Sequence, residues 1–317
     1  MSEAEVPAKR APTRRRFVEA LPAGPPVERT PKPPWLKIRL RTNEAYKSVR
    51  RTMETLQLHT VCEEAHCPNI YECWGEKTAT FMILGDVCTR RCGFCAVMTG
   101  TPGRVDPLEP AHLAEAVEKM GLAHAVITSV DRDDLPDGGA SHFAAVIRAV
   151  RRRVSGCAVE ILTPDFKGAA GALEIVLAAS PDVFAHNIET VPRLYRSVRP
   201  GSVYAHSLSL LEQAKAKGAP LTKSGLMLGL GETRAEIREV LSDLRAARVD
   251  IVTIGQYLQP STGHLPVGRY LPPEEFEAIR GEAMPLGFRH VEAGPLVRSS
   301  YHASRHVRRQ TDSTGGP

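Results

Sequence analysis

The 317-residue sequence contains no long apolar run, few aromatic residues and no strong excess of charge of either sign. A membrane-spanning helix needs about 18 or more consecutive apolar residues, and no stretch of this sequence provides them. The N-terminus also lacks the apolar core of a secretory signal, and its early Glu3 and Glu5 are unlike an organelle transit peptide. We therefore expect no membrane association and a cytoplasmic location.

Aromatic residues make up only 5% of the chain, and no basic stretch is interleaved with them. Proteins that bind nucleic acid commonly combine basic stretches with aromatic stacking platforms, so we expect no nucleic-acid partner. The formal net charge of +5 fits either ordinary solubility or a surface that attracts acidic partners. The charge alone does not decide between these two interpretations.

The two ends of the sequence are unsuited to a packed structure. Residues 1–34 contain many prolines together with the Arg14–Arg16 run. Proline fixes the backbone and removes an amide donor, so this composition predicts a flexible or extended arm over residues 1–34. The tail after His302 is polar, which predicts a mobile end.

Between these ends, short apolar runs alternate with segments of helical periodicity. Such an alternation predicts right-handed βαβ units and a parallel sheet, and about six units fit an α/β fold of the incomplete (β/α)6 barrel type, similar to a TIM barrel. In barrels the chemistry lies at the carboxyl ends of the strands. The expected strands are Phe81–Leu84, Ala125–Ser129, Val159–Leu162, Val183–His186, Ser224–Leu228 and Ile251–Gln256, and the expected helices include Leu113–Met120, His142–Val150, Gly171–Ala179 and Arg234–Ala246.

Cysteine is unevenly distributed, because six of the seven cysteines fall between Cys62 and Cys95. A cytoplasmic chain keeps its thiols reduced, so this crowding indicates metal binding rather than disulfides. The seventh, Cys157, stands alone and is expected to be an ordinary buried apolar residue.

The later group of cysteines, Cys88, Cys92 and Cys95, has the spacing C-x3-C-x2-C and follows an expected strand. Three thiolates on so short a loop can hold one face of an iron–sulfur cluster and leave one iron open for a substrate or cofactor. A structural zinc site is the alternative, although it would need a fourth ligand from elsewhere. With Phe94 before the last cysteine, the motif resembles that of the radical S-adenosylmethionine (SAM) superfamily, in which the open iron holds SAM.

The earlier group, Cys62, Cys67 and Cys73, has the spacing C-x4-C-x5-C. These thiols are too close together to be ordinary core cysteines, and again a fourth ligand is missing. His66 could serve as that ligand, but beside Cys67 we favour a hydrogen bond within the loop.

This pair of cysteine motifs, in this order, is similar to the arrangement in lipoyl synthases. The likeness runs from about Trp35 to Ala303 and so covers most of the chain. The segments that carry it beyond the cysteines are 126–134, 182–189, 225–232, 255–261 and 294–303, the last of which contains Arg298-Ser299-Ser300-Tyr301.

The resemblance implies two [4Fe-4S] clusters, one that binds SAM and one auxiliary cluster that donates sulfur. It also implies that Ser300 is the missing fourth ligand of the auxiliary cluster, beside Cys62, Cys67 and Cys73. Serine oxygen is a hard ligand for this soft site, so its bond should be weaker than that of a thiolate. Our hypothesis is that this weak bond lets one iron leave when the cluster gives up sulfur.

The resemblance divides the chain into four expected parts. Residues 1–34 form the flexible arm, residues 35–80 bind the auxiliary cluster, and residues 81–270 form the radical SAM partial barrel. Residues 271–317 form a C-terminal segment that closes the site and ends in the mobile tail.

The resemblance also implies SAM contacts. Ser129 and Asp131 follow an expected strand and would line the SAM pocket, although a solvated acidic turn is an equal alternative for either residue. Asn187 and Glu189 end another strand and could bind the ribose hydroxyls or amino group of SAM.

Glu160 and Lys223 occupy comparable positions on their strands and are further candidates for SAM binding. Met227 lies in a segment that resembles the adenine-contacting strand of the superfamily, but it could equally be a core residue.

The implied activity is the radical-mediated insertion of two sulfur atoms into an octanoyl chain, which makes the chain a radical SAM sulfurtransferase. An aliphatic C–H bond offers no acidity to a general base, so radical chemistry is required. The implied partners are octanoylated lipoyl-carrier proteins, namely lipoyl domains of 2-oxoacid dehydrogenases and the glycine cleavage H protein, and a flavodoxin or ferredoxin as electron donor. Alternatives are a biotin-synthase-like enzyme, a two-cluster electron-transfer protein and a zinc-stabilised binding module.

Overall fold

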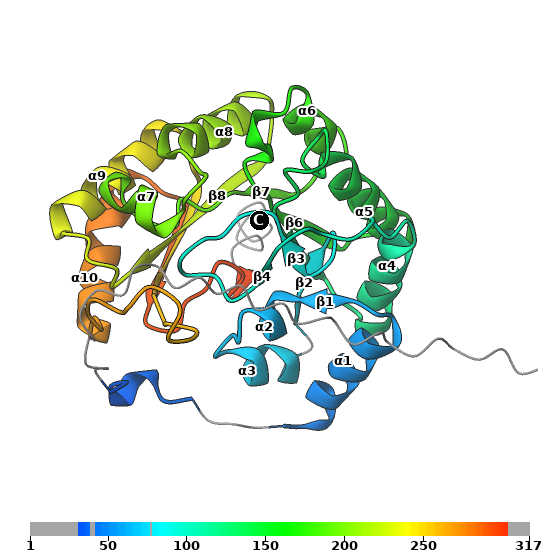
Figure 1. Ribbon diagram of the computed structural model, residues 1–317, viewed down its shortest axis with the longest axis horizontal. Coiled ribbons are helices and arrows are strands. Elements are labelled where there is room, and N and C mark those ends of the chain that lie inside the picture. Colours follow the sequence, from blue (N-terminus) through cyan, green and yellow to red (C-terminus); the bar gives the residue numbers. More distant parts are fainter. Residues whose placement is uncertain (1–30, 39–41, 77, 304–317) are drawn as a thin grey trace, which may run out of the picture.

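The computed structural model describes residues 31–38, 42–76 and 78–303. The expected arm at residues 1–34 lies almost wholly outside these residues, and so does most of the expected mobile tail. The centre of the molecule is a curved sheet of strands surrounded by helices (Figure 1).

The sheet has eight strands in the order β1-β2-β5-β6-β7-β8-β9-β10. All neighbouring strands pair in parallel except β1 and β2, which are antiparallel. In the part of the chain that the structure describes, the edge strands β1 and β10 do not pair with each other, so the barrel is open. The strands are β1 (His59–Thr60), β2 (Thr80–Ile83), β5 (His124–Ser129), β6 (Ala158–Leu162), β7 (Val183–Ala185), β8 (Leu221–Leu228), β9 (Ile251–Gln256) and β10 (His290–Gly294).

The expectation of an incomplete α/β barrel is confirmed, and all six expected strands are present within a few residues of their predicted bounds. The parallel strand β10 was not expected. The strands of a parallel barrel usually appear in the sequence as runs of apolar residues. Strand β10 instead carries His290 and Glu292, whose side chains are hydrogen-bonded to each other at 3.0 Å. Its polar residues hid the strand from a search for apolar runs.

Helices surround the sheet and form the outer layer of the barrel (Figure 1). In α9 the apolar residues recur at the helical period, and Thr233 begins the helix with a capping box to Glu236. Helix α8 was missed in the sequence because its buried residues include Ser207. No helix in the described ranges is long and apolar enough to span a bilayer. The outer helices are α4 (Glu109–Met120), α5 (Ala140–Arg153), α6 (Ala172–Leu177), α8 (Tyr204–Ala216), α9 (Arg234–Ala246) and α10 (Pro273–Ala283).

The main core lies between the sheet and the outer helices. Phe81 and Ile127 from the strands pack in the same buried cluster as Leu113 and Phe143 from the helices, and all four side chains are fully buried. Cys157 belongs to this layer, which confirms that it is an ordinary buried residue.

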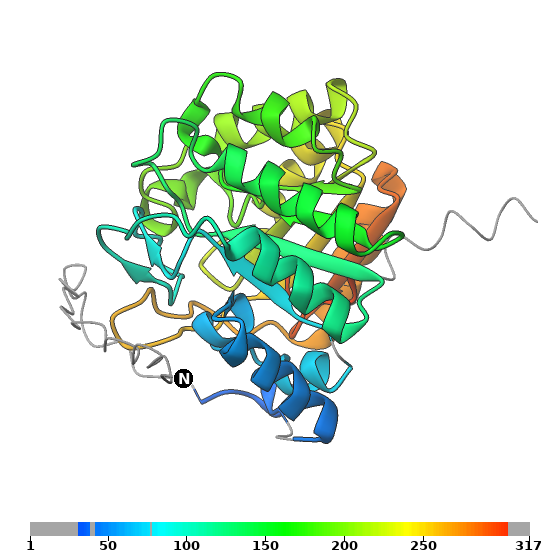
Figure 2. The same cartoon turned by 90° about the vertical axis from the view of Figure 1, so that its right-hand side faces the viewer.

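The open side of the barrel is covered by three N-terminal helices, α1 (Glu44–Thr55), α2 (Val61–Glu64) and α3 (Ile70–Gly75). Helix α1, in blue, lies beside the outer helix α4 (Figures 1 and 2). Trp74 of α3 is fully buried and its ring centroid lies 5.2 Å from that of Tyr46 on α1. This aromatic contact fixes α3 against α1 and so fixes the loop that carries the first three cysteines.

Candidate active site

The cysteine loop that contains Cys88, Cys92 and Cys95 follows β2 and lies at the carboxyl ends of the strands. It includes two short paired strands, β3 (Val87–Cys88) and β4 (Met98–Thr99). Backbone hydrogen bonds hold it from three sides. The Thr89 amide donates to the Asp131 carbonyl at 3.0 Å, the Gly93 amide to the Val198 carbonyl at 2.9 Å, and the Leu265 amide to the Gly93 carbonyl at 3.0 Å.

A buried arginine anchors the same loop. The Arg90 guanidinium makes two hydrogen bonds of 2.8 Å to the Asp133 carboxylate and one of 2.6 Å to Asp165. Burial alone would raise the pKa of Asp165, but the hydrogen bond and charge of Arg90 outweigh it and lower that pKa to about 2. The loop is thus tied to the segments that follow β5 and β6 by charge-assisted bonds. Arg90 was not predicted from the sequence, although its position between two candidate ligand cysteines, Cys88 and Cys92, was a signal.

The thiols of both cysteine groups have raised pKa values. Burial raises the pKa of Cys88 to about 12, with a further contribution from Asp131, and raises those of Cys95 and Cys62 to about 11. Without iron these thiols are protonated at neutral pH, so iron binding must displace their protons. Backbone amides of Arg90 and Asp131 point at the Cys88 sulfur, at 3.4 and 3.3 Å, and would stabilise the thiolate.

Polar groups gather beside this loop at the carboxyl ends of β5 and β7. In the part of the chain that the structure describes, Ser129 Oγ and Asn187 Oδ1 are buried without a hydrogen-bond partner. Burial raises the pKa of both Asp131 and Glu189, and the charges of these two carboxylates act on the Cys95 thiol. Buried polar atoms normally have partners, so this set fits a polar ligand seated next to the cysteines.

Met227 joins the same region, because its backbone amide donates to the Glu189 carbonyl at 2.9 Å. Glu189 adopts a left-handed backbone conformation with φ of 68° just after β7. Such a conformation in a residue other than glycine is uncommon and often occurs at functional sites.

Glu160 and Lys223 lie elsewhere. Glu160 is the middle residue of β6 and pairs with Val126 of β5 and Val183 of β7. Lys223 on β8 pairs with Ala185, the last residue of β7, and with Ile251, the first residue of β9. Both residues therefore lie within the strands rather than in the loops at their carboxyl ends. Lys223 Nζ is 2.8 Å from Glu160 Oε1, both side chains are almost fully buried, and His124 lies 3.3 Å from the same carboxylate. Burial would raise the pKa of Glu160, but the charge of Lys223 and the hydrogen bond to His124 lower it to about 2. The structure does not bring this ion pair to the cysteine loop.

The second cysteine group forms a compact turn at the open side of the barrel. Cys62 lies on α2 and Cys73 on α3, and the Cys67 amide donates to the Cys62 carbonyl at 3.0 Å. Burial first, and then the charges of Cys62 and Cys67, raise the pKa of Cys73. The three thiols therefore lie near enough to influence one another electrostatically.

Residues 296–302, which we call the C-terminal strap, pack against this turn. The Asn69 amide nitrogen Nδ2 donates to the Leu296 carbonyl at 2.7 Å. Thr80 Oγ1 donates to Ser300 Oγ at 2.7 Å, and the Thr80 backbone is also hydrogen-bonded to Cys62. Ser300 is thus brought to the second cysteine group by a residue that contacts both.

Among the described residues, no three histidine, cysteine or carboxylate side chains converge closely enough for a single metal ion. A four-iron cluster is larger than one ion and needs its ligands further apart. The donor set is of the kind that holds iron–sulfur clusters, with three thiols in each group, of which Cys62 and Cys88 are buried and the others half-buried.

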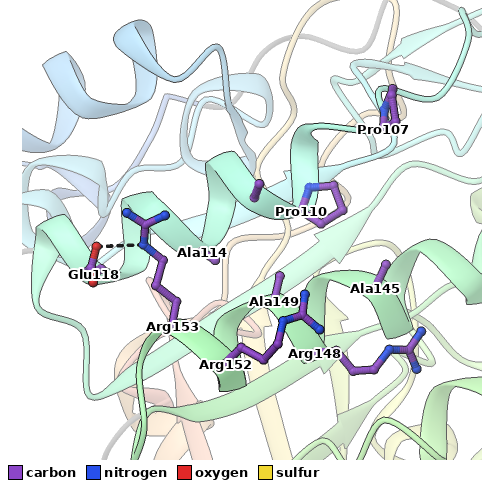
Figure 3. Close-up of a pocket in the computed structure, with 10 residues that line it drawn as sticks. Pro107, Pro110, Ala114, Glu118, Ala145, Arg148, Ala149, Arg152 and Arg153 are labelled. Atoms are coloured by element: carbon purple, nitrogen blue, oxygen red, sulfur yellow. Dashed lines mark hydrogen bonds and ion pairs between the residues drawn. The ribbon is translucent and has the colours of Figure 1, made fainter.

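A separate groove lies on the outer surface between α4 and α5 (Figure 3). Its lining is mainly proline, alanine and arginine and includes no cysteine. Arg153 in this groove pairs with Glu118 at 2.7 Å. The groove therefore plays no part in the cysteine sites, and its residues serve below as controls.

Comparisons with known proteins agree with this geometry. Residues 82–244 match the radical SAM superfamily, and residues 17–67 match the N-terminal domain of lipoyl synthase of the radical SAM family. A lipoyl synthase from Rubrobacter xylanophilus is 58% identical over 91% of this chain and 93% of that protein. One from Thermus thermophilus is 57% identical over 92% of this chain and 90% of that protein.

The chain belongs to the lipoyl synthase family. A lipoyl synthase from Methylococcus capsulatus, 54% identical, matches it over 96% of this chain and 97% of that protein. Membership confirms the predicted enzyme class, a radical SAM sulfurtransferase, and the predicted cofactors, SAM and [4Fe-4S] clusters. The zinc-module, electron-transfer and biotin-synthase-like alternatives are therefore wrong.

Solved structures support the fold alone. SuiB from Streptococcus suis bound to S-adenosylmethionine has a TM-score of 0.53 at 11% identity, covering 71% of this chain and 54% of that chain. HydG, a maturase of the [FeFe]-hydrogenase, has a TM-score of 0.51 at 12% identity, covering 71% and 62%. The lipoyl synthase family shares its partial barrel with these proteins.

Arg90→Lys should lower the iron content after anaerobic reconstitution to about half, because lysine keeps the charge but loses the two-pronged contact to Asp133. Only the loop that contains Cys88, Cys92 and Cys95 (the Cys88 loop) would be loosened, so a cluster at the second cysteine group should remain. The measurement is iron per chain, with Arg153→Ala as a surface control. A full iron content in Arg90→Lys would show that the anchor is dispensable.

Lys223→Met should destabilise the fold by about 3–5 kcal/mol, because it leaves the Glu160 carboxylate buried without its partner. Replacing both residues, as Glu160→Gln with Lys223→Met, should recover most of this loss. Urea unfolding measures both effects. If Lys223→Met kept full stability and instead lost SAM affinity, the pair would belong to the SAM site after all.

The Glu160–Lys223 pair should make the stability of the fold depend on pH. The pKa of Glu160 is lower in the folded chain than its ordinary value of 4.5, so its stabilising contribution is complete above that value. This contribution to stability should be lost progressively as pH falls from about 4.5 to about 2. The Glu160→Gln, Lys223→Met variant should lack this loss of stability when its urea unfolding is measured over the same pH range.

Proposed function

We propose that this chain inserts two sulfur atoms into an octanoyl chain on a lysine of a lipoyl-carrier domain. In this proposal Cys88, Cys92 and Cys95 hold the SAM-binding cluster. The auxiliary cluster is held by Cys62, Cys67, Cys73 and Ser300. The contact of Thr80 with both Cys62 and Ser300 carries the assignment, because it unites a serine near the C-terminus with the N-terminal cysteine group.

When bound, the two clusters supply one-electron cleavage of SAM and a source of sulfur, and the chain supplies the rest. Three protein ligands at the Cys88 loop leave one iron for SAM. Ser129 Oγ and Asn187 Oδ1 would accept hydrogen bonds from SAM, since both are buried and lack a partner in the described ranges. Asp131, Glu189 and Met227 complete the proposed contacts. We leave Glu160 and Lys223 out of the SAM site, because within the strands their buried charges already satisfy each other.

Part of the barrel interior suits an aliphatic chain. On β5, β7 and β8 the residues that alternate with the outward-packed ones include Val126, Ala185 and Gly225, which are small or apolar, and also Lys223 of the buried ion pair. Val126 and Ala185 are almost fully buried. Small or apolar residues at these positions would help to exclude water, orient an acyl chain and protect a reactive carbon from side reactions.

In this proposal, successive segments of the chain have different roles. Residues 35–80 bind the auxiliary cluster, and the barrel begins at residue 81. We extend the barrel past residue 270, because β10 pairs with β9 as far as Gly294. The closing segment is then the C-terminal strap, and the arm at residues 1–34 has no assigned role.

The proposal includes the partners and the location. The carriers would be octanoylated lipoyl domains of 2-oxoacid dehydrogenases or the glycine cleavage H protein, the electron donor a flavodoxin or ferredoxin, and the compartment the cytoplasm. Arg196 is a candidate for carrier contact. It is exposed on α7 (Tyr195–Val198), the helix whose Val198 carbonyl is bonded to the cysteine loop.

The reconstituted chain, given SAM, a reductant and an octanoyl-lysine peptide without oxygen, should yield a peptide with two added sulfurs and release deoxyadenosine. The measurement is mass spectrometry of both products. Replacing Cys62, Cys67 and Cys73 by alanine should abolish sulfur insertion but keep deoxyadenosine release. Ser300→Cys should assemble its cluster but insert sulfur more slowly, because thiolate holds iron more tightly than serine. Normal turnover by Ser300→Cys would disprove the weak-ligand hypothesis.

Arg196→Glu should lower kcat/KM for an acidic octanoylated carrier domain by about 3- to 10-fold at low salt, since it reverses a charge beside the mouth of the barrel. The effect should shrink at high salt and be absent with the short peptide. Arg148→Glu on the distant α4–α5 groove is the matched control. Equal losses in both variants would indicate a general charge effect rather than a docking contact.

A further inference from the structure

Two glycines on neighbouring strands make room for the C-terminal strap inside the barrel. A Cβ atom on Gly255 of β9 would overlap the Val297 carbonyl oxygen. A Cβ atom on Gly225 of β8 would lie 2.7 Å from Asn187 Oδ1 and 3.2 Å from Ser299 Oγ. Neither glycine has a positive φ, so space rather than backbone conformation requires glycine at these positions.

Ser299, the first serine of the strap, is hydrogen-bonded to the barrel and not to the second cysteine group. Asn187 Nδ2 donates to Ser299 Oγ at 2.7 Å. The next residue, Ser300, faces the other way and accepts from Thr80. Adjacent serines are thus held by two different parts of the fold, one by the carboxyl end of β7 and one by the amino end of β2.

Asn187 is itself fixed from the side of the other cysteine loop. Its backbone carbonyl accepts a hydrogen bond of 2.7 Å from Arg199 Nη1, and the charge of Arg199 acts on the Cys92 thiol. The position of Ser299 therefore depends on a residue that borders the Cys88 loop. The charge of Arg199 acts on that loop, and two hydrogen bonds, from Arg199 to Asn187 and from Asn187 to Ser299, continue the link to the strap.

We propose that Ser299 and Asn187, seated by Gly225 and Gly255, form a latch that positions Ser300 at the second cysteine group. Ser299 is thus a positioning residue and not a ligand. One part of this proposal, that the latch positions a cluster ligand, rests on the proposed function, in which Ser300 is that ligand. Its immediate effect, holding the strap in the barrel, is independent of any cluster.

The first test uses the full chain without clusters. Trypsin can cut after Arg298 only when the strap leaves its seat, because a protease needs a locally unfolded segment. Ser299→Ala removes one part-buried hydrogen bond and should speed this cut about fivefold. Gly255→Ala, which collides with the strap backbone, should speed it at least as much. Mass spectrometry follows the fragment that ends at Arg298.

Gly281→Ala on α10 is the matched control, because nothing lies within 4 Å of its added Cβ atom. It should leave the cut rate unchanged. Circular dichroism checks that each variant is folded, and Ser299→Ala, a small change, keeps the test valid if Gly255→Ala does not fold. Cut rates unchanged in Ser299→Ala would overturn the latch.

The second test separates the latch from the ligand assignment. In a background where Cys88, Cys92 and Cys95 are alanine, only the auxiliary cluster can be assembled. Ser299→Ala should then speed the loss of iron to a chelator about fivefold, in parallel with the tryptic cut. A faster cut with unchanged iron loss would support the latch and overturn Ser300 as a ligand.

Discussion

The site depends on a barrel that does not close. A parallel sheet whose edge strands remain apart leaves backbone groups and apolar side chains that other segments must cover. The helices α1 to α3 cover one edge of the opening and the C-terminal strap enters from the other, and they meet where Asn69, the residue before α3, donates a hydrogen bond to the Leu296 carbonyl. These two residues are 227 positions apart in the sequence. The opening in the sheet is thus the reason why the two ends of the described chain form one site.

Buried charge serves two distinct purposes in this fold. Arg90 is bonded to Asp133 and Asp165 and holds a cysteine loop that has little regular structure of its own. The Glu160–Lys223 pair lies among the strands of the barrel, and its two charges satisfy each other. His124 beside it has a buried Nδ1 without a partner in the described residues, as do Ser129 Oγ and Asn187 Oδ1. Ser129 and Asn187 lie near the cysteine loop, so their unsatisfied atoms mark the side of the barrel that fits a ligand.

The strap gives the two cysteine groups a physical connection that neither motif contains. Gly225 and Gly255 are needed because backbone and a serine side chain pass where side chains of the strands would otherwise lie. Ser299 then bonds toward the barrel and Ser300 toward the N-terminal turn. Ser299 and Ser300 lie in a turn in which the Tyr301 amide donates to the Arg298 carbonyl at 2.9 Å, and their hydroxyls bond to different partners, so this one segment contacts both sites.

Local spacing and apolar periodicity were enough to predict the class of fold and to find the two cysteine groups. The family followed from the resemblance of these motifs and of several other segments to lipoyl synthases. All six expected strands and four expected helices are found, since strand and helix periods are read within a few residues. The sequence by itself missed β10, whose polar residues conceal a strand, and α8, whose buried face includes a serine. It could not pair Glu160 with Lys223, because these residues are 63 positions apart and only the assembled sheet brings their side chains together. It also missed Arg90, Thr80 and the role of Ser299. Their partners are distant in the sequence, so only the tertiary structure decides which residues they meet.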